Sequence, residues 1–350
     1  MYEDLGIDFL TAPQAAVGFA LLLGAAFGAL AEISGFCFRS SLVGDDRRQK
    51  SGVWLAALAT AILGTQAAVF SGWVDFSDHR FLVSDLPLLA IAIGGVMFGA
   101  GMVLTRGCAS RLTVLTATGN LRALTVLVVF AITAHATLKG ILAPLRTTLG
   151  SYTVDIGDAT TLAALPGGGM LWAGVIAVLA LVFALTSGNR PAMLITGTLI
   201  GALVPLGWVG TGYVLYDDFD PIALESLSFT STWADTLFWT VAASSIPAGF
   251  GTGLIGGTLI GAFLAAALFR RLAWQSFSSP RETGRYLLGA TLIGVGGVLA
   301  GGCTVGAGLA GIPTLSLAAL LALTAISLGG ILTHALLKPR ALQSNLSPAE

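Results

Sequence analysis

Residues 286–311 read YLLGATLIGVGGVLAGGCTVGAGLAG, and this stretch decides the fold. It is apolar and rich in glycine, and it reaches a cysteine that is followed by a threonine. Shorter versions of the same phrase stand at 35–37, which reads GFC, and at 106–110, which reads RGCAS. Each follows a glycine-rich apolar run, and together the three phrases hold every cysteine of the chain. The pattern predicts three helices that break at a thiol inside a membrane.

The composition is that of an integral membrane protein. Of 350 residues, 55% are hydrophobic and 10% are charged, whereas soluble domains carry about 25% charged residues. The mean hydropathy of +0.87 agrees. The 46 glycines are nearly twice the usual share, which indicates close helix contacts and broken helices. A net charge of −1 offers no basic surface for nucleic acid.

Several kinds of site are excluded by the same count. Three cysteines cannot form a fully paired disulfide framework, and their spacing matches neither a zinc site nor a CxxC redox pair. No phosphate-binding loop or dinucleotide fingerprint is present. We therefore expect no metal and no cofactor. Residues 1–8 lack the features of a signal peptide, so the first apolar run is expected to be a retained helix.

Apolar runs of about 20 residues are long enough to cross a bilayer, and they predict an all-α polytopic membrane protein with nine crossings. The runs are 14–35, 52–73, 87–105, 121–142, 170–187, 192–211, 249–270, 286–301 and 314–337. Four shorter apolar pieces lie between them, at 36–43, 108–118, 233–247 and 303–311. They are too short to cross and too apolar for ordinary loops. We interpret them as three or four re-entrant half-helices, covered by protein or facing a cavity.

Charges alternate from one connection to the next and indicate orientation. Arginine and lysine follow the first, third, fifth, seventh and ninth runs, whereas the other connections are acidic. The positive-inside rule predicts an N-terminus outside and a C-terminus in the cytoplasm of an inner-membrane protein. This holds only if 233–247 does not cross, which the sequence leaves open. The five acidic residues of 217–235 predict a solvated external loop.

The chain also looks duplicated. The run GGVMFG at 94–99 leads to Cys108 as GGVLAG at 296–301 leads to Cys303. The run GAAFG at 24–28 leads to Cys37 as GTLIG at 197–201 leads to Trp208. We predict one domain, 1–350, made of inverted halves 14–142 and 170–337 joined by 143–169. Inverted halves with broken helices are typical of transporters, whose substrate site lies near the membrane midplane.

The breaks combine groups that suit a sulfur anion. The first amides of a half-helix lack partners and favour an anion, and glycines allow a close approach. A neutral S–H is a weak donor that would hold a terminal sulfur loosely, as passage requires. A single buried cysteine is usually a small hydrophobic residue, but three at matching breaks favour a function. The candidate residues are Cys37, Cys108, Cys303, Gly107, Ser110, Gly302, Thr304, Arg106 and Arg111.

The two arginines of this set have two interpretations. Arg106 and Arg111 either lie at the cytoplasmic edge of the membrane or draw anions to the inner mouth. A fourth break is predicted near Trp208, and this tryptophan takes the position that a cysteine takes at the other three breaks.

These motifs resemble the YeeE/YedE family of membrane proteins, which is associated with the uptake of thiosulfate and other sulfur compounds. The likeness rests on GFCFR at 35–39, on Gly107-Cys108 and above all on GGCTVGAGL at 301–309, and it extends over about 14–337. The resemblance implies an hourglass-shaped channel with Cys37, Cys108 and Cys303 as relay points. It also implies a small cytoplasmic sulfurtransferase partner. Thiosulfate-type members tend to have Gly-Gly-Cys at the middle site, where this chain has Arg106-Gly107-Cys108.

The leading hypothesis is therefore an inner-membrane transporter for thiosulfate or a related sulfur anion, and not an enzyme. The alternative is a membrane thiol enzyme or sulfurtransferase that forms covalent cysteine persulfides. That enzyme would need an activated thiolate, and no general base is evident beside any cysteine. A third interpretation is a structural or regulatory membrane subunit, for which no solute would matter.

Overall fold

The computed structural model describes residues 10–157, 159–217 and 219–337. The acidic N-terminal residues 1–8 and the charges at 338 and 340 lie outside these ranges. Within them, nine segments are long and apolar enough to cross a membrane. Their main helices are α1 (Ala12–Ser34), α3 (Arg47–Phe70), α4 (Leu88–Leu104), α6 (Leu121–Lys139), α8 (Gly168–Thr186), α9 (Pro191–Val209), α11 (Phe250–Leu268), α12 (Pro280–Leu299) and α13 (Leu317–Leu337).

Short elements continue or connect these helices. At the predicted breaks lie α2 (Phe38–Val43), α5 (Ala109–Ala117) and the π-helix η4 (Thr304–Gly311), which is followed by the 3-10 turn η5 (Ile312–Thr314). The connections hold α7 (Ala143–Gly150), η2 (Leu162–Ala164), α10 (Ser231–Ala242) and an antiparallel pair of β1 (Asp85–Leu86) with β2 (Val154–Asp155). The all-α polytopic fold with short broken helices is confirmed.

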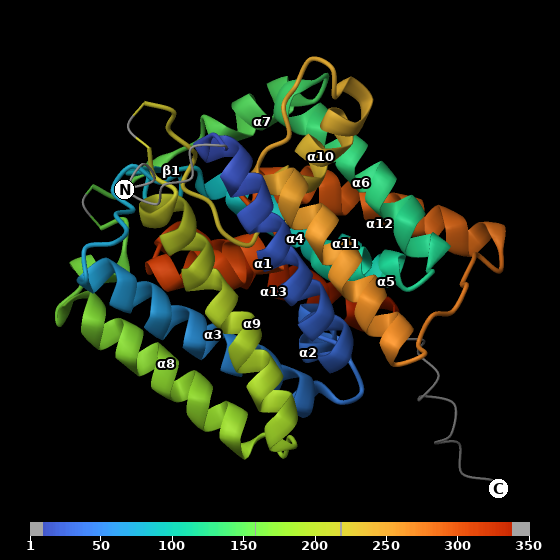
Figure 1. Cartoon of the computed structure of the whole chain (residues 1–350), viewed down its shortest axis with the longest axis horizontal. Coiled ribbons are helices and arrows are strands. Elements are labelled where there is room, and N and C mark those ends of the chain that lie inside the picture. The colour runs from blue at the N-terminus through green and yellow to red at the C-terminus, as the bar shows by residue number, and fades with distance from the viewer. Residues whose placement is uncertain (1–9, 158, 218, 338–350) are drawn as a thin grey trace, which may run out of the picture.

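The crossings alternate in direction between two ends of the molecule. One end, here called the acidic end, carries the start of α1 with α7 and α10 (Figure 1). The opposite end carries α2, α5 and the arginines near 106, 111, 122 and 271, and is called the basic end. The 12 residues of α10 span about 18 Å, too little to cross. The helix α10 therefore does not add to the candidate crossings, whose number in the described ranges stays at nine.

One boundary and one break differ from the predictions. α12 begins at Pro280, six residues before the predicted 286, because Ser279 caps the helix by accepting a hydrogen bond from the Glu282 amide (3.3 Å). The expected break near Trp208 is wrong. Trp208 lies inside α9, which continues past Pro205 and then passes into the π-helical turn η3 (Gly210–Val214) without leaving helical backbone angles.

The expectation of a solvated loop at 217–235 is also wrong for its second part. Leu227 and Phe229 are completely buried, and the Phe229 ring lies 5.1 Å from the ring of Phe27 in α1. The acidic residues in this stretch hid the alternating apolar positions that drive it into the protein. Residues 223–230 thus form an extended segment, here called the inner loop, that enters the helix bundle.

Glycines let the helix backbones touch. A side chain at Gly24 or Gly28 of α1 would strike the α11 backbone, and one at Gly257 or Gly261 would strike the α1 backbone. Without side chains between them, helices gain dispersion contacts that lipid cannot match. Similar contacts join α4 to α12 and α13, and α3 to α9. The glycine content therefore builds a tightly packed bundle. The inverted halves 14–142 and 170–337 stay a prediction.

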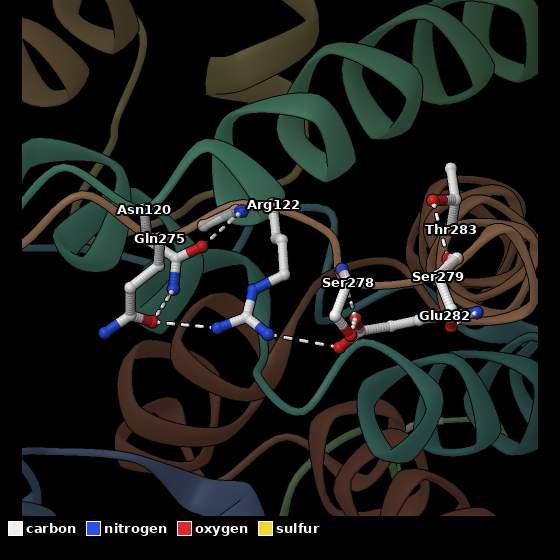
Figure 2. A network of polar contacts seen from close by, with 8 residues as sticks. Asn120, Arg122, Gln275, Ser278, Ser279, Glu282 and Thr283 are labelled. Carbon is white, nitrogen blue, oxygen red and sulfur yellow. Dashed lines mark hydrogen bonds and ion pairs between the residues drawn. The ribbon is translucent and has the colours of Figure 1, made fainter.

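A polar network closes the basic end (Figure 2). Gln275, in the loop between α11 and α12, accepts hydrogen bonds from Asn120 and Arg122 (both 2.9 Å). Arg122 also pairs with Glu282 at 3.1 Å, and Ser278 donates to the same carboxylate at 2.7 Å. The network fastens the junction of α5 and α6 to the start of α12.

Candidate functional site

Cys37 stands at the junction of α1 and α2. Gly35 ends α1 in the left-handed region (φ 62°), where a glycine costs least, and Cys37 then takes the N-cap position of α2. Its carbonyl accepts a hydrogen bond from the Ser41 hydroxyl at 3.2 Å. The side chain is 7% exposed, so this sharp turn places the thiol inside the protein.

Cys108 has the same place between α4 and α5. Its Sγ lies 3.3 Å from the hydroxyl of Ser110, and both residues are buried. The turn before it is held by Thr105, whose hydroxyl lies 2.9 Å from the Gly107 carbonyl and 2.9 Å from the Gly101 carbonyl. Arg106 lies in the left-handed region (φ 60°), which is uncommon for a residue with a side chain. The predicted break thus positions Cys108 and Ser110 together.

Cys303 precedes η4 and is completely buried. The turn is made at Gly301 (φ 75°), and the amide of Gly306 donates a hydrogen bond to Cys303 Sγ at 3.3 Å. The Cys303 sulfur therefore accepts the hydrogen bond of one of the first amides of η4, and this amide is not available to a solute. Gly302 is buried against η4, where a side chain would strike the amide of Ala307.

The three junctions meet inside the bundle. The side chains of Cys37 and Cys108 adjoin and interact. The Thr304 hydroxyl, next in the chain after Cys303, faces the Cys108 thiol. That hydroxyl is buried and has no well-aligned hydrogen-bond partner in the described ranges. Residues far apart in the sequence thus form one buried group, here called the thiol cluster (Cys37, Cys108, Cys303 and Thr304).

A cavity of about 720 Å³ connects the acidic end with this region. It extends from the loop between α3 and α4 to Gly306 and Ala310 of η4. The inner loop forms another wall, on which Ser228 lies against Gly306. Because Gly306 also contacts Cys303, the cavity ends beside the first thiol of the cluster.

Charged groups in this cavity influence each other. Burial and the neighbouring Arg80 cation lower the pKa of His79 to about 4, so this imidazole is neutral near pH 7. Burial also lowers the pKa of Arg80, opposed by Glu225 and by Cys303. Burial raises the pKa of Glu225, with Asp235 acting in the same direction and Arg80 against it. Arg80 and Glu225 therefore interact electrostatically within the cavity.

A smaller cavity of about 230 Å³ lies at the basic end. Arg106 and Thr105 line it, so it comes within two residues of Cys108. Arg111 lies elsewhere. It pairs with Glu32 of α1 at 3.5 Å and donates to the Ala31 carbonyl at 3.4 Å. The structure therefore separates the two arginines that the sequence placed together.

Several residues near the site were missed by the sequence interpretation. Glu32, Arg80 and Ser228 received no role, although Glu32 is an acidic residue inside an apolar run, which is a functional signal by itself. Arg80 stands out as a cation in an acidic connection. Ser228 alternates with Leu227 and Phe229, and this two-residue period was the signal for a buried extended segment.

Comparison with known proteins agrees with the family resemblance found in the sequence. A family profile described as Sulphur transport matches residues 33–332, a range that contains all three cysteines. The thiosulfate transporter TsuA of Escherichia coli (strain K12) is 24% identical in an alignment 322 residues long that covers 83% of this chain and 85% of that protein. The thiosulfate transporter TsuA of Spirochaeta thermophila is 27% identical in an alignment 335 residues long that covers 86% of this chain and 93% of that protein. The resemblance to YeeE/YedE is confirmed, and this multi-pass membrane protein belongs to the Sulphur transport family.

Proposed function

We propose that this protein is an inner-membrane transporter that takes thiosulfate or a related sulfur anion into the cell. The observation that carries the proposal is the thiol cluster, buried between a cavity at the acidic end and one at the basic end. Two relatives of nearly full length bear the name thiosulfate transporter. The positive-inside rule supports an acidic end outside and a basic end in the cytoplasm.

The proposed route follows the contacts. An anion enters the large cavity and reaches Cys303 beside Gly306. Cys108 adjoins Cys37, and Thr304, the residue after Cys303, adjoins Cys108, so Thr304 connects the position of Cys303 to the other two thiols. The weak S–H donors contact the terminal sulfur and release it readily.

The oxygen-bearing end needs harder donors. The hydroxyls of Ser110 and Thr304 lie beside Cys108, and Thr304 Oγ1 is free to donate. We include the backbone at Gly107 and Gly302 because both positions are glycine next to a thiol. Arg106 at the inner cavity is proposed to attract the departing anion, whereas Arg111 keeps its ion pair with Glu32. A cytoplasmic sulfurtransferase, implied by the family resemblance, is the proposed recipient.

The test is uptake of ³⁵S-labelled thiosulfate into cells that lack other uptake routes. Expression of this chain is expected to produce uptake, and variants with alanine at a cysteine of the cluster are expected to lose it. Wild-type chain that reaches the membrane and takes up no label would contradict the proposal. The enzyme alternative is tested with the same material by mass spectrometry after exposure to thiosulfate. A persistent persulfide on Cys108 would favour that alternative, since a relay leaves no covalent adduct.

A further inference from the structure

The large cavity contains a cation, Arg80, that has no close counter-ion among the described residues. Arg80 lies in the connection between α3 and α4 and remains accessible from the cavity. Its guanidinium stacks over the Phe81 ring at 5.2 Å, and in the described ranges it forms no ion pair. Its charge interacts with Glu225 and with Cys303. Arg80 is therefore near enough to a carboxylate of the cavity wall and to Cys303 for its charge to interact with both.

Glu225 faces Arg80 across a gap instead of touching it. Thr211 of η3 holds the backbone of Glu225 in the inner loop. Its hydroxyl accepts a hydrogen bond from the Glu225 amide (3.0 Å) and donates one to the Glu225 carbonyl (2.8 Å). The side chain of Glu225 is thus free to change its charge while its backbone stays fixed. A group inserted in the gap would meet the cation on one side and the carboxyl on the other.

Two further donors of this cavity have no partner. Trp208 is 3% exposed, and its Nε1–H makes no hydrogen bond in the described ranges. Ser228 likewise has a buried hydroxyl without a partner. Buried donors normally find an acceptor, so two donors of one cavity that lack a partner in the described ranges indicate an acceptor-rich ligand. An oxyanion such as thiosulfate or sulfate has this chemistry.

We propose, on the basis of the proposed function, that Arg80 is the outer receptor for the oxygen-bearing end of the anion and that Glu225 is its exchangeable counter-ion. While Glu225 is ionised it compensates Arg80, and when Glu225 takes a proton from the outer solution Arg80 is free for the anion. When the anion moves on, the proton returns to the outer solution. No bond to sulfur is made or broken in this step.

The sign of the pH dependence follows. Because the pKa of Glu225 is raised, it accepts a proton as the outer pH falls, so anion binding tightens at lower pH. A bound dianion raises this pKa further, and binding takes up a proton. His79, with a pKa of about 4, stays neutral over the range that matters. The other titratable or charged groups around this cavity are Asp75 and Asp78, Tyr216 after η3, Asp235 of α10 with His135 and Lys139 of α6 near it, and Cys303.

The experiment measures thiosulfate and sulfate binding to the purified full chain by calorimetry. The pH of the solution is varied between about 5 and 8, which lies above the pKa of an ordinary carboxyl group. Wild type is expected to bind more tightly at low pH and to take up protons, seen as a dependence of the heat on the buffer. Glu225→Gln is expected to bind tightly at every pH. Arg80→Gln is expected to weaken binding roughly tenfold or more, the loss of one charged hydrogen bond, with partial recovery in Arg80→Lys. Asp78→Asn is the matched control, since it removes the same charge elsewhere in the cavity.

Two outcomes would overturn the assignment. One is a Glu225→Gln variant with the wild-type pH profile, and the other is an Asp78→Asn variant that changes this profile as much as Glu225→Gln. Cys108→Ala separates this site from the transport function, because it should keep outer binding and lose uptake. If uptake is normal and binding is unaffected by Arg80→Lys and Arg80→Gln, the assignment of Arg80 as the receptor is wrong and the proposed transport function stands. If binding depends on Arg80 but the wild type takes up no thiosulfate, the proposed transport function is wrong and the binding site stands.

Discussion

Cys108 is the residue on which the arrangement converges. Its side chain adjoins Cys37 and Thr304 and lies 3.3 Å from the Ser110 hydroxyl. A small buried thiol with three polar neighbours differs from a cysteine that only fills space, whose neighbours would be apolar. Substitution at this position therefore distinguishes a packing role from contact with substrate.

We expect Cys108→Ala to lower thiosulfate uptake roughly tenfold or more, since 1.4 kcal/mol of lost contact is a factor of ten. Cys108→Ser should be impaired as well, because a hydroxyl is a harder donor that matches terminal sulfur poorly. The measurement is the initial rate of ³⁵S uptake at equal protein in the membrane. Thr258→Ala in α11 is the control, because it also removes a buried polar atom, one bonded only within its own helix at 2.7 Å. Normal transport by Cys108→Ala would contradict the relay.

Glu32 shows how a charge is tolerated within an apolar helix. The carboxylate is 8% exposed and is approached by Arg111 at 3.5 Å and Arg271 at 4.0 Å. The helices α1 and α5 and the connection that follows α11 are thereby joined at the basic end. Removing the carboxylate leaves the partly buried Arg111 without its counter-ion, whereas Arg271 is half exposed and remains hydrated.

Glu32→Gln is therefore expected to lower the free energy of unfolding by about 1–3 kcal/mol, less than for a fully buried pair because Arg111 and Arg271 remain partly hydrated. Thermal unfolding in detergent measures this as a lower midpoint. Asp45→Asn, an exposed acidic residue on the loop after α2, should leave the midpoint unchanged. Equal midpoints for Glu32→Gln and wild type would mean that the pair contributes nothing.

The pairing of α1 with α11 is the most extensive contact between elements in the described ranges, and the sequence contains a matched test of it. Gly256 and Gly257 are neighbours in α11, yet a side chain at Gly257 would strike the Leu21 carbonyl of α1, whereas one at Gly256 would meet open space. The intrinsic helix propensity changes equally at both positions.

Gly257→Ala is expected to separate the two helices and to lower both the yield of folded protein and the unfolding midpoint. Gly256→Ala should gain up to about 1 kcal/mol from helix propensity alone. Size-exclusion profiles and melting curves of the two variants in detergent provide the comparison. If both variants behave alike, the two helices do not meet as closely as described.

The elements also show what the sequence was able to predict. Runs of apolar residues specify helices in a bilayer because every backbone group must be paired inside the segment, so the nine crossings were predictable. The breaks at Gly35, Gly107 and Gly301 were predictable because glycine before a cysteine interrupts each run. The inner loop was not, because its burial depends on a space left by other helices and its acidic residues dominate the local composition. Trp208 was assigned to a break by analogy with the cysteines, although Pro205 is accommodated within α9.

Across the whole molecule, the pairing of distant groups was beyond a single sequence. The Cys108 and Thr304 contact joins positions nearly 200 residues apart, and the Arg80 and Glu225 pair joins two different connections. Such pairs depend on how helices pack, for which residue spacing alone holds no signal. What the sequence did predict was that the thiols belong together, because the same phrase surrounds each of them.

The proposed orientation makes a prediction for the entire molecule. In a variant with cysteine introduced at exposed Ser77, in the connection between α3 and α4, a membrane-impermeant maleimide added to intact cells should label the protein. A variant with cysteine at exposed Ser278, between α11 and α12, should be labelled only after the membrane is opened. The wild-type chain is the control, because its three thiols are buried. The opposite pattern would invert the proposed direction of transport.

The thiols of Cys37, Cys108 and Cys303 are 7%, 1% and 0% exposed, so water from either side stops short of them. We therefore expect a chain in this conformation to be impermeable to protons and inorganic ions. The cell can thus keep many copies of it at rest without discharging its electrochemical gradients.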